Sequence, residues 1–531
     1  MSVFYDVPKV TQVDVISSWL TLEDVAKLDL ATCNHRYRKE LLEAFKSPEC
    51  VLGYLEFGWD YISPWVIARQ IKCSAISLSV RVLAPETNRK ALLEIMGPSL
   101  TSLELMCGDY GDEDEDEADE RESASMDKMS MREIIDDCTR YCTALVEIRL
   151  HAANLDKKLA ALIQNNPKLK CITLTECTKI SSAIMGAIIA CPCLETFKLE
   201  ECVMKSEAFS CEFEPNTTCT TVTLTSSDTA NYMPGVFAVA FPSAVTLDIS
   251  ILTQANLAEV ASKCKAVKTA KILLHEDLEL AHATAIATHW QDIRSLEINP
   301  AEQLESVCEQ DVVLLFVDRC LSLERLVLAP LECTDLPPAQ YSSNESHVSK
   351  IRELSVCALD EPGLLHILNK CKYLYTLGLY APEPVDLDGG ELAHTEFFLR
   401  HLQHSSVKAL YLTNALNLNS AQLQKLSNLH SLVLCSAGSD YTLDASEVTE
   451  FVRRCPELHT LCIYDCETIH SKVVLAVLPV APRLTRLEYY SGPKTLHYRE
   501  TSVAWMFRCM VEEKYPNITK FEIHVEAAHE W

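Results

Sequence analysis

Glycine and basic residues are scarce in this chain. Only 13 of the 531 residues are glycine, and 47 lysines and arginines stand against 75 aspartates and glutamates, a formal net charge of −28 at pH 7. A surface this acidic repels a phosphate backbone, so we expect no nucleic-acid partner. The charge either steers basic proteins toward the chain or only keeps it soluble.

Motifs that carry catalysis are also missing. The sequence has no G-x-x-x-x-G-K-[ST], G-x-G-x-x-G, G-x-S-x-G or H-E-x-x-H. Loops that cradle phosphates and turns that expose nucleophiles therefore lack their residues. Gly492-Pro-Lys-Thr495 has no upstream glycine at the spacing of a phosphate loop. We expect a protein that is not an enzyme, with no catalytic residue and no cofactor.

Long apolar runs and a targeting pattern at the N-terminus are absent as well. The longest apolar stretches, Ala183 to Leu194 and Val473 to Ala481, are shorter than the roughly 18 residues of a membrane span. The first residues show no basic region followed by an apolar run, so they predict no signal peptide. We therefore expect no membrane contact, a cytoplasmic or nuclear location and reduced thiols at the 24 cysteines.

One apolar pattern, L-x-x-L-x-L with apolar substitutes, recurs along most of the chain. Its middle apolar residues are spaced 24, 25, 25 and 25 residues apart at Ile148, Ile172, Phe197, Val222 and Leu247. The series reaches upstream to Leu103 and downstream to Ile523, about sixteen units with the roughly 20–29-residue period of leucine-rich repeats.

Each unit predicts one short strand and one helix. The L-x-L alternation has the period of a strand, and stretches such as 181–190 have the broad apolar face of a helix. A single unit cannot bury its apolar face, whereas stacked units can. We predict an α/β leucine-rich-repeat solenoid, a horseshoe with a concave parallel β-sheet and helices on the convex side.

Cysteines recur at fixed positions of the repeat, as in Cys191 to Cys202 and Cys455 to Cys466. Cysteine is a small apolar residue with a weak donor, which suits the tight turn after each strand. A zinc site at Cys191 and Cys193, or at Cys462 and Cys466, lacks a second spaced pair, so we predict no metal. The register resembles the cysteine-containing repeats of F-box receptors, which recognise degradation substrates.

The first 48 residues lack the repeat and carry signals for helix starts. Thr11-x-x-Asp14 and Thr21-x-x-Asp24 fit the capping box. We expect one helix with Val13, Ile16, Trp19 and Leu20 on a face, a second with Val25, Leu28 and Ala31, and a third over 36–45.

This segment resembles an F-box at Pro8, Ile16, Leu20, Asp24-Val25 and Cys33, with Val7 in place of the usual leucine and without the tryptophan expected after the cysteine. The resemblance implies docking to a Skp-type adaptor of a cullin–RING ubiquitin ligase, through Pro8, Ile16, Trp19, Leu20, Asp24, Val25 and Leu28. A solenoid also needs its end repeat covered, so the segment is alternatively an N-terminal cap. The two roles are compatible.

The rest of the chain divides into parts according to how regular its apolar repeat is. We predict degenerate first repeats over residues 49–98 and the regular solenoid over residues 99–531, with a C-terminal cap at about 501–531. The run from Asp112 to Glu120 should repel itself, which predicts an insertion loop over about 108–130. A solvated loop is favoured over a site for a basic partner.

Residues at the third, fifth and seventh positions of L-x-x-L-x-L-x should point to the concave surface. Threonines occupy many of these positions in the early units, such as Thr173 and Thr223. Later units place tyrosines there, which are typical interface hot spots. The predicted partner-binding patch is Tyr380, Tyr411, Tyr464, Tyr490, Val433, Cys435 and Cys462. The alternative is an ordinary strand preference for aromatics.

These features favour a protein-interaction module, in particular the substrate-recognition subunit of a Skp-cullin-F-box type ubiquitin ligase. The alternative is a scaffold or inhibitor that binds a protein partner in the concave face without any ligase. A regulator of a small GTPase is a more distant hypothesis, because no catalytic arginine can be assigned.

Overall fold

A computed structural model describes most of the chain. It covers residues 8–32, 35–47, 49–57, 62–79, 86–107, 120–204, 213–225, 234–251, 254–300, 310–328, 347–357, 361–380, 402, 405–413, 426–435, 445–464, 476–490, 511 and 514–524. The chain forms two compact units, residues 1–250 with 263–266 and residues 251–262 with 267–531.

The first unit contains one parallel sheet whose strands follow chain order. The strands are β1 (Val51–Phe57), β2 (Lys72–Ser79), β3 (Ser102–Met106), β4 (Glu147–His151), β5 (Cys171–Thr175), β7 (Thr196–Glu200), β9 (Thr221–Thr225) and β10 (Thr246–Ile251). A short second sheet pairs β6 (Thr178–Ile180) with β8 (Val203–Met204).

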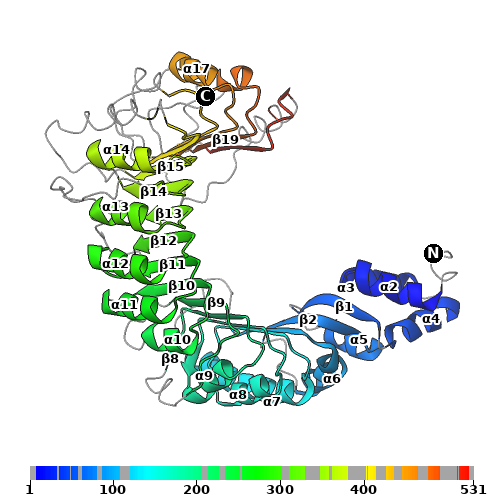
Figure 1. The fold of residues 1–531 in the computed structure, drawn as a ribbon. Coiled ribbons are helices and arrows are strands. Elements are labelled where there is room, and N and C mark those ends of the chain that lie inside the picture. The colour runs from blue at the N-terminus through cyan, green and yellow to red at the C-terminus, as the bar shows by residue number, and fades with distance from the viewer. Residues whose placement is uncertain are drawn as a thin grey trace. The chain divides into compact units, whose positions relative to one another are not determined.

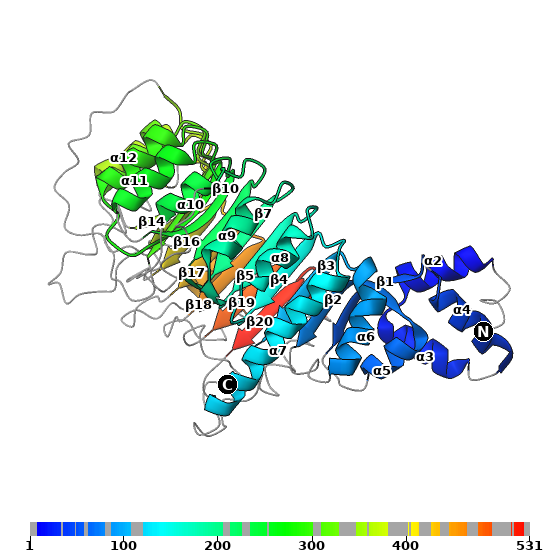
Figure 2. The same cartoon turned by 90° about the horizontal axis from the view of Figure 1, so that it is seen from below.

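Helices of the first unit cover one face of this sheet, as Figure 2 shows for α7, α8 and α9. They are α5 (Ile62–Arg69), α6 (Glu86–Met96), α7 (Glu120–Tyr141), α8 (Lys158–Gln164), α9 (Ser182–Ile189) and α10 (Pro234–Ala240), with the 3-10 turn η2 (Gly97–Ser99). Three more helices precede β1: α2 (Lys9–Trp19), α3 (Leu22–Ala31) and α4 (His35–Phe45).

The second unit repeats this plan. Its parallel strands, again in chain order, are β11 (Thr269–Leu274), β12 (Ser295–Pro300), β13 (Arg325–Leu328), β14 (Glu353–Cys357), β15 (Thr376–Tyr380), β16 (Ala409–Thr413), β17 (Ser431–Cys435), β18 (Thr460–Tyr464), β19 (Arg486–Tyr490) and β20 (Lys520–His524). Helices α11 (Gln254–Lys263), α12 (Leu280–His289), α13 (Gln310–Arg319) and α14 (Glu361–Lys370) stack along one face (Figure 1), and α17 (Ala445–Arg454) and η3 (Leu478–Val480) follow.

The apolar residues predicted to stack do so in register. In the first unit one buried row runs through Leu103, Ile148, Ile172, Phe197, Val222 and Leu247. In the second unit the row runs through Leu296, Leu326, Leu354, Leu377, Leu410, Leu432, Leu461, Leu487 and Phe521. The predicted α/β leucine-rich-repeat solenoid is confirmed. We call the sheet surface opposite the helices the open face.

Two turns between helix and strand are held by a buried asparagine three positions before the first apolar residue of the repeat. Asn166, 1% exposed, donates from Nδ2 to Cys142 O (3.0 Å) and Leu162 O (2.8 Å), and its Oδ1 accepts from Leu145 N (2.9 Å). Asn216 makes the same kind of bridge to Cys191 O (2.8 Å) two repeats later. Backbone groups that the turns leave unpaired are satisfied in this way.

Cysteines occupy more than one place in the repeat, and the sequence predicted only the turn after each strand. Cys177 and Cys202 follow strands, as expected, and Cys202 Sγ donates to Leu174 O at 3.2 Å. Cys191 and Cys455 instead lie buried in the turn that precedes a strand. Burial raises the pKa of the Cys191 thiol to about 11, which is typical of an inert structural thiol.

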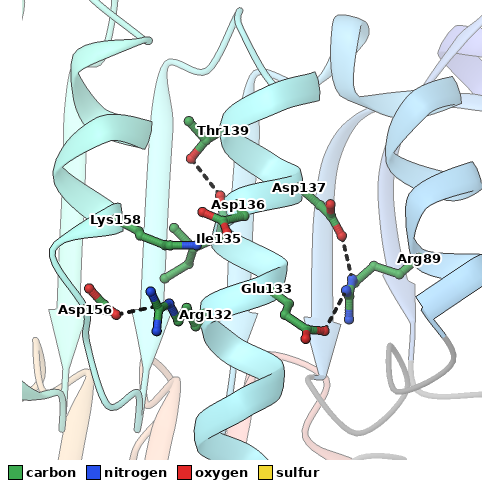
Figure 3. A network of polar contacts seen from close by, with 9 residues as sticks. All are labelled: Arg89, Arg132, Glu133, Ile135, Asp136, Asp137, Thr139, Asp156 and Lys158. Carbon is green, nitrogen blue, oxygen red and sulfur yellow. Dashed lines mark hydrogen bonds and ion pairs between the residues drawn. The ribbon is translucent and has the colours of Figure 1, made fainter.

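The acidic insertion enters a long helix sooner than the sequence predicted. Residues from Glu120 onward belong to α7, so the expected loop over about 108–130 is helical in about its second half, while 108–119 lie outside the described residues. Ion pairs hold α7 between its neighbours (Figure 3): buried Arg89 contacts Asp137 at 2.8 Å and Glu133 at 3.1 Å, and Lys158 of α8 pairs with Asp136. Charges on α7 thus fix its place in the helical layer.

Helix starts in the N-terminal segment agree with the sequence at one site and differ at another. Thr21 and Asp24 form the predicted capping box of α3. The first helix, however, begins at Lys9 with Pro8 at its N-cap, so Thr11 lies inside the helix and caps nothing. Proline at the N-cap tolerates this start because its missing N–H needs no partner there.

We predict that Asn166→Ala destabilises the protein by about 3 kcal/mol, because three buried hydrogen bonds at about 1 kcal/mol each are lost. Urea unfolding followed by circular dichroism measures the change. Asn165→Ala is the matched control, since Asn165 makes one exposed 3.3 Å hydrogen bond to Thr139 O. An equal shift of the urea midpoint in the two variants would contradict the role of Asn166.

Candidate protein-binding face

Half-exposed and buried residues alternate along the strands, and this alternation defines the open face. In β3, β5 and β7 the leucine positions are buried, and the residues between them are half-exposed. Because successive side chains of a strand point to opposite faces, the half-exposed set belongs to the open face. The face is therefore lined by the third, fifth and seventh positions of the repeat, as the sequence predicted.

Three residues of the predicted patch lie side by side in one row. Tyr411 on β16 is the register partner of Val433 on β17, which in turn is the partner of Cys462 on β18. Tyr411 is 40% exposed, whereas Val433 and Cys462 are buried at 9% and 1%. Tyr411 is the member of this row that a partner can reach.

Tyr464 lies at the predicted strand position, but its side chain is buried and is not exposed to a partner. Only 8% of it is exposed, and it packs with Val433 and Cys462 in one cluster. Its hydroxyl donates a short hydrogen bond to the carboxylate of Glu488 on β19. The polar tip that would serve a hot spot is already used within the sheet.

Glu488 is the centre of a charge cluster that the sequence analysis missed. It is 1% exposed, and Arg486 Nε lies 2.8 Å from its Oε1 while Lys520 of β20 contacts the same oxygen. Burial opposes ionisation of Glu488, but hydrogen bonds from Arg486, Lys520 and Tyr464 outweigh burial and lower the pKa of its carboxyl to about 2. The signal in the sequence is an acid at a fifth position flanked by bases at third positions.

The other members of the patch are placed by their backbone alone. Tyr380, Cys435 and Tyr490 end β15, β17 and β19, in the same register row as Tyr464. Their side chains lie outside the described residues. The seventh positions therefore form one row across the strands, as predicted.

The predicted adaptor-binding residues divide between the core and the surface of the N-terminal helices. Ile16 and Val25 are fully buried, whereas Pro8 is exposed and Leu20 and Leu28 are half-buried. Asp24 accepts from Thr21 Oγ1 at 2.8 Å, and hydrogen bonds from Thr21 lower the pKa of its carboxyl. The side chain of Trp19 lies outside the described residues.

A buried carboxylate ties these helices to the first repeat. Asp29 of α3 is 1% exposed, and its Oδ2 accepts from Arg69 Nε (2.8 Å) and Trp65 Nε1 (3.1 Å), both on α5. Its other oxygen lies 3.6 Å from Arg38 of α4. Nothing in the spacing of the sequence distinguished Asp29 from its solvated neighbours.

Metal and membrane sites were sought in the same described ranges. They hold no group of three or more His, Cys, Asp or Glu side chains arranged for a metal ion. No helix within those ranges has both the length and the apolar character that a membrane crossing requires.

Comparison with known proteins gives structural similarity only. The chain is similar to a chain in the structure of the Toll–Spatzle complex from Drosophila, with a TM-score of 0.41 and 15% identity over 82% of this chain and 53% of that one. This chain thus spans about half the length of that match. It is also similar to a chain in the Rad7 and Elc1 complex of yeast, with a TM-score of 0.29 and 12% identity over 90% and 89% of the two chains. No family model and no curated protein sequence matches it.

We predict that Glu488→Gln lowers the free energy of unfolding by about 2 kcal/mol at neutral pH, because charge-assisted hydrogen bonds are lost. The pKa of Glu488 is about 2 in the folded state against the usual 4.5 of a glutamate, so its contribution is present above pH about 4.5 and is lost as the pH falls toward 2. Urea unfolding between pH 3 and 7 measures the difference between variant and wild type.

Glu457→Gln is the control for this experiment, since Glu457 forms an exposed ion pair with Arg483. Its effect should stay small at every pH. A Glu488→Gln effect of constant size across the pH range would rule out the stabilising role of the ionised carboxylate.

Proposed function

We propose that this protein is the substrate-recognition subunit of a Skp-cullin-F-box type ubiquitin ligase. In this proposal the N-terminal helices α2 to α4 hold a Skp-type adaptor, and the open face of the repeat sheet holds the target protein. The observation that carries it is the division of the N-terminal apolar residues into a buried set and an exposed set.

The buried set accounts for attachment to the repeats. Ile16 and Val25 are 0% exposed, and the Asp29 network joins α3 to α5. These residues are occupied within the chain, so a partner cannot contact them without unfolding the segment. Capping of the first repeat is the role that they serve.

The exposed set is available for a partner. Val10 of α2 is 72% exposed and Leu30 of α3 is 70% exposed, and Leu20 and Leu28 are half-buried. Apolar side chains this exposed are typical of a surface that a second protein covers. This set, rather than Ile16 or Val25, is where we place the adaptor.

Co-purification of the intact chain with a Skp-type adaptor tests this role. We expect Leu30→Asp and Leu20→Asp to lose the adaptor, because each places a charge in an apolar contact. Leu321→Asp is the matched control, because Leu321 is a leucine at 47% exposure on a turn of the repeats. Ile16→Asp is unsuitable as a first test, since it buries a charge and unfolds the segment.

Equal adaptor binding by wild type and Leu30→Asp would show that the adaptor does not contact Leu30. No adaptor binding by the intact chain would exclude the ligase role. The alternative, a scaffold or inhibitor without a ligase, would then remain. It is favoured by the same buried set, because Ile16, Val25 and Asp29 give the N-terminal helices a structural purpose of their own.

Either role places a protein partner on the open face near Tyr411. We predict that Tyr411→Ala weakens partner binding by about five- to thirtyfold, since truncating an interface tyrosine typically costs about 1–2 kcal/mol. Tyr54→Ala is the control, because Tyr54 of β1 is 55% exposed. Quantitative crosslinking with mass spectrometry compares the partners retained by each variant. Unchanged partner recovery with Tyr411→Ala would move the binding surface elsewhere.

A further inference from the structure

Residues at the second position of the repeat form a row along the starts of the strands in the second unit. Each backbone N–H in the row donates to the carbonyl of the row residue one repeat earlier, as from Arg294 to Lys268 (2.7 Å), from Tyr375 to Arg352 (2.8 Å) and from Lys408 to Tyr375 (2.8 Å). These bonds hold the row residues at the spacing of neighbouring strands, about 4.8 Å.

Four of the row residues are basic. Lys268, Arg294 and Arg352 are exposed and Lys408 is half-buried, and they precede β11, β12, β14 and β16. We call these four residues the basic rim. One acid, the exposed Glu324, lies between Arg294 and Arg352. The rim therefore carries an excess of three positive charges within a chain whose net charge is −28.

The positive charges of the rim are not neutralised within the described ranges. None of the four basic side chains forms an ion pair with a described carboxylate, and Lys408 Nζ contacts only the carbonyl of Asn428 at 3.3 Å. Charges next to the rim differ in this respect. On the open face Arg325 pairs with Glu297 (2.9 Å) and with Glu353 (3.0 Å).

The same row in the first unit gives an internal comparison. Its members before β3 to β10 are Thr101, Val146, Lys170, Glu195, Thr220 and Val245. Lys170 and Glu195 pair at 2.6 Å, so this row is neutral. The excess of positive charge is a property of the second unit and does not follow from the repeat.

Aromatic side chains also belong to the row: Tyr375 lies between Arg352 and Lys408, and His430 and His459 follow Lys408. Tyr375 Oη lies 3.0 Å from His430 Nδ1, and the His430 and His459 rings are 5.9 Å apart, edge to face. Tyr375 is 47% exposed. Such rings give an extended ligand an apolar surface and hydrogen-bonding groups beside the charges.

We propose that the basic rim binds an extended acidic segment of a partner protein, about seven residues long. From β11 to β16 the rim crosses five strand steps, about 24 Å, which an extended peptide spans with about seven residues at roughly 3.3 Å each. A short acidic peptide is favoured over a nucleic acid, because a longer polyanion would also meet the acidic remainder of the chain. The inference does not depend on the ligase role, since it concerns neither α2 to α4 nor the adaptor.

Fluorescence anisotropy of the full chain with a labelled (Glu-Asp)4 peptide tests the rim. We expect Arg294→Glu combined with Arg352→Glu to weaken binding at least tenfold at low salt, and 0.5 M NaCl to weaken binding by wild type. Arg319→Glu combined with Arg453→Glu is the matched control, with the same change in net charge on the exposed helix residues of α13 and α17. The control should stay within twofold of wild type.

Arg294→Gln combined with Arg352→Gln removes the charges without reversing them, and a urea midpoint equal to that of wild type shows that the variant is folded. It should bind with intermediate affinity. Absence of peptide binding by wild type at low salt, or equal binding by wild type and the reversed rim, overturns the proposal. So does an eight-residue thymidine oligonucleotide that binds at least as tightly as the peptide and is lost on rim reversal, because the rim would then be a nucleic-acid site.

Discussion

A strand of five residues with two inward leucines cannot bury them alone, and the structure depends on this constraint. Each repeat is stable only when the next repeat lies in register beside it. In the first unit Ile148 lies between Leu103 and Ile172, and all three are fully buried. The same constraint fixes the period, because each unit must return the chain to the next strand. Insertions are accommodated only between the apolar rows.

Backbone polarity imposes a second requirement at the turns. Each turn from helix to strand would bury unpaired carbonyl and amide groups, and side chains such as Asn166 and Asn216 satisfy them. At the equivalent position Cys191 and Cys455 fill the space as small apolar residues. Packing thus accounts for the cysteines at these positions.

The open face and the rim show how the repeats vary where the core does not constrain them. Around Glu488 the charges are balanced by Arg486 and Lys520, and Tyr464 is drawn into that cluster. Tyr411 remains accessible beside it. The rim has no such compensation within the described ranges, because none of its four basic side chains forms an ion pair with a described carboxylate. A surface with unmatched charge is where a repeat protein can acquire a partner.

The sequence by itself determined the repeat, the order of the strands and which residues face inward, because the apolar period of the strand and the length of the unit are local properties. It also located the row of fifth positions that contains Tyr411. Tertiary structure alone decided which of these side chains are accessible. Tyr464 was predicted as a contact residue, but its hydroxyl meets Glu488 from the next strand, 24 residues away in sequence. Asp29 is buried through its contacts with Arg69 and Trp65 of α5, which no spacing within its own helix could predict.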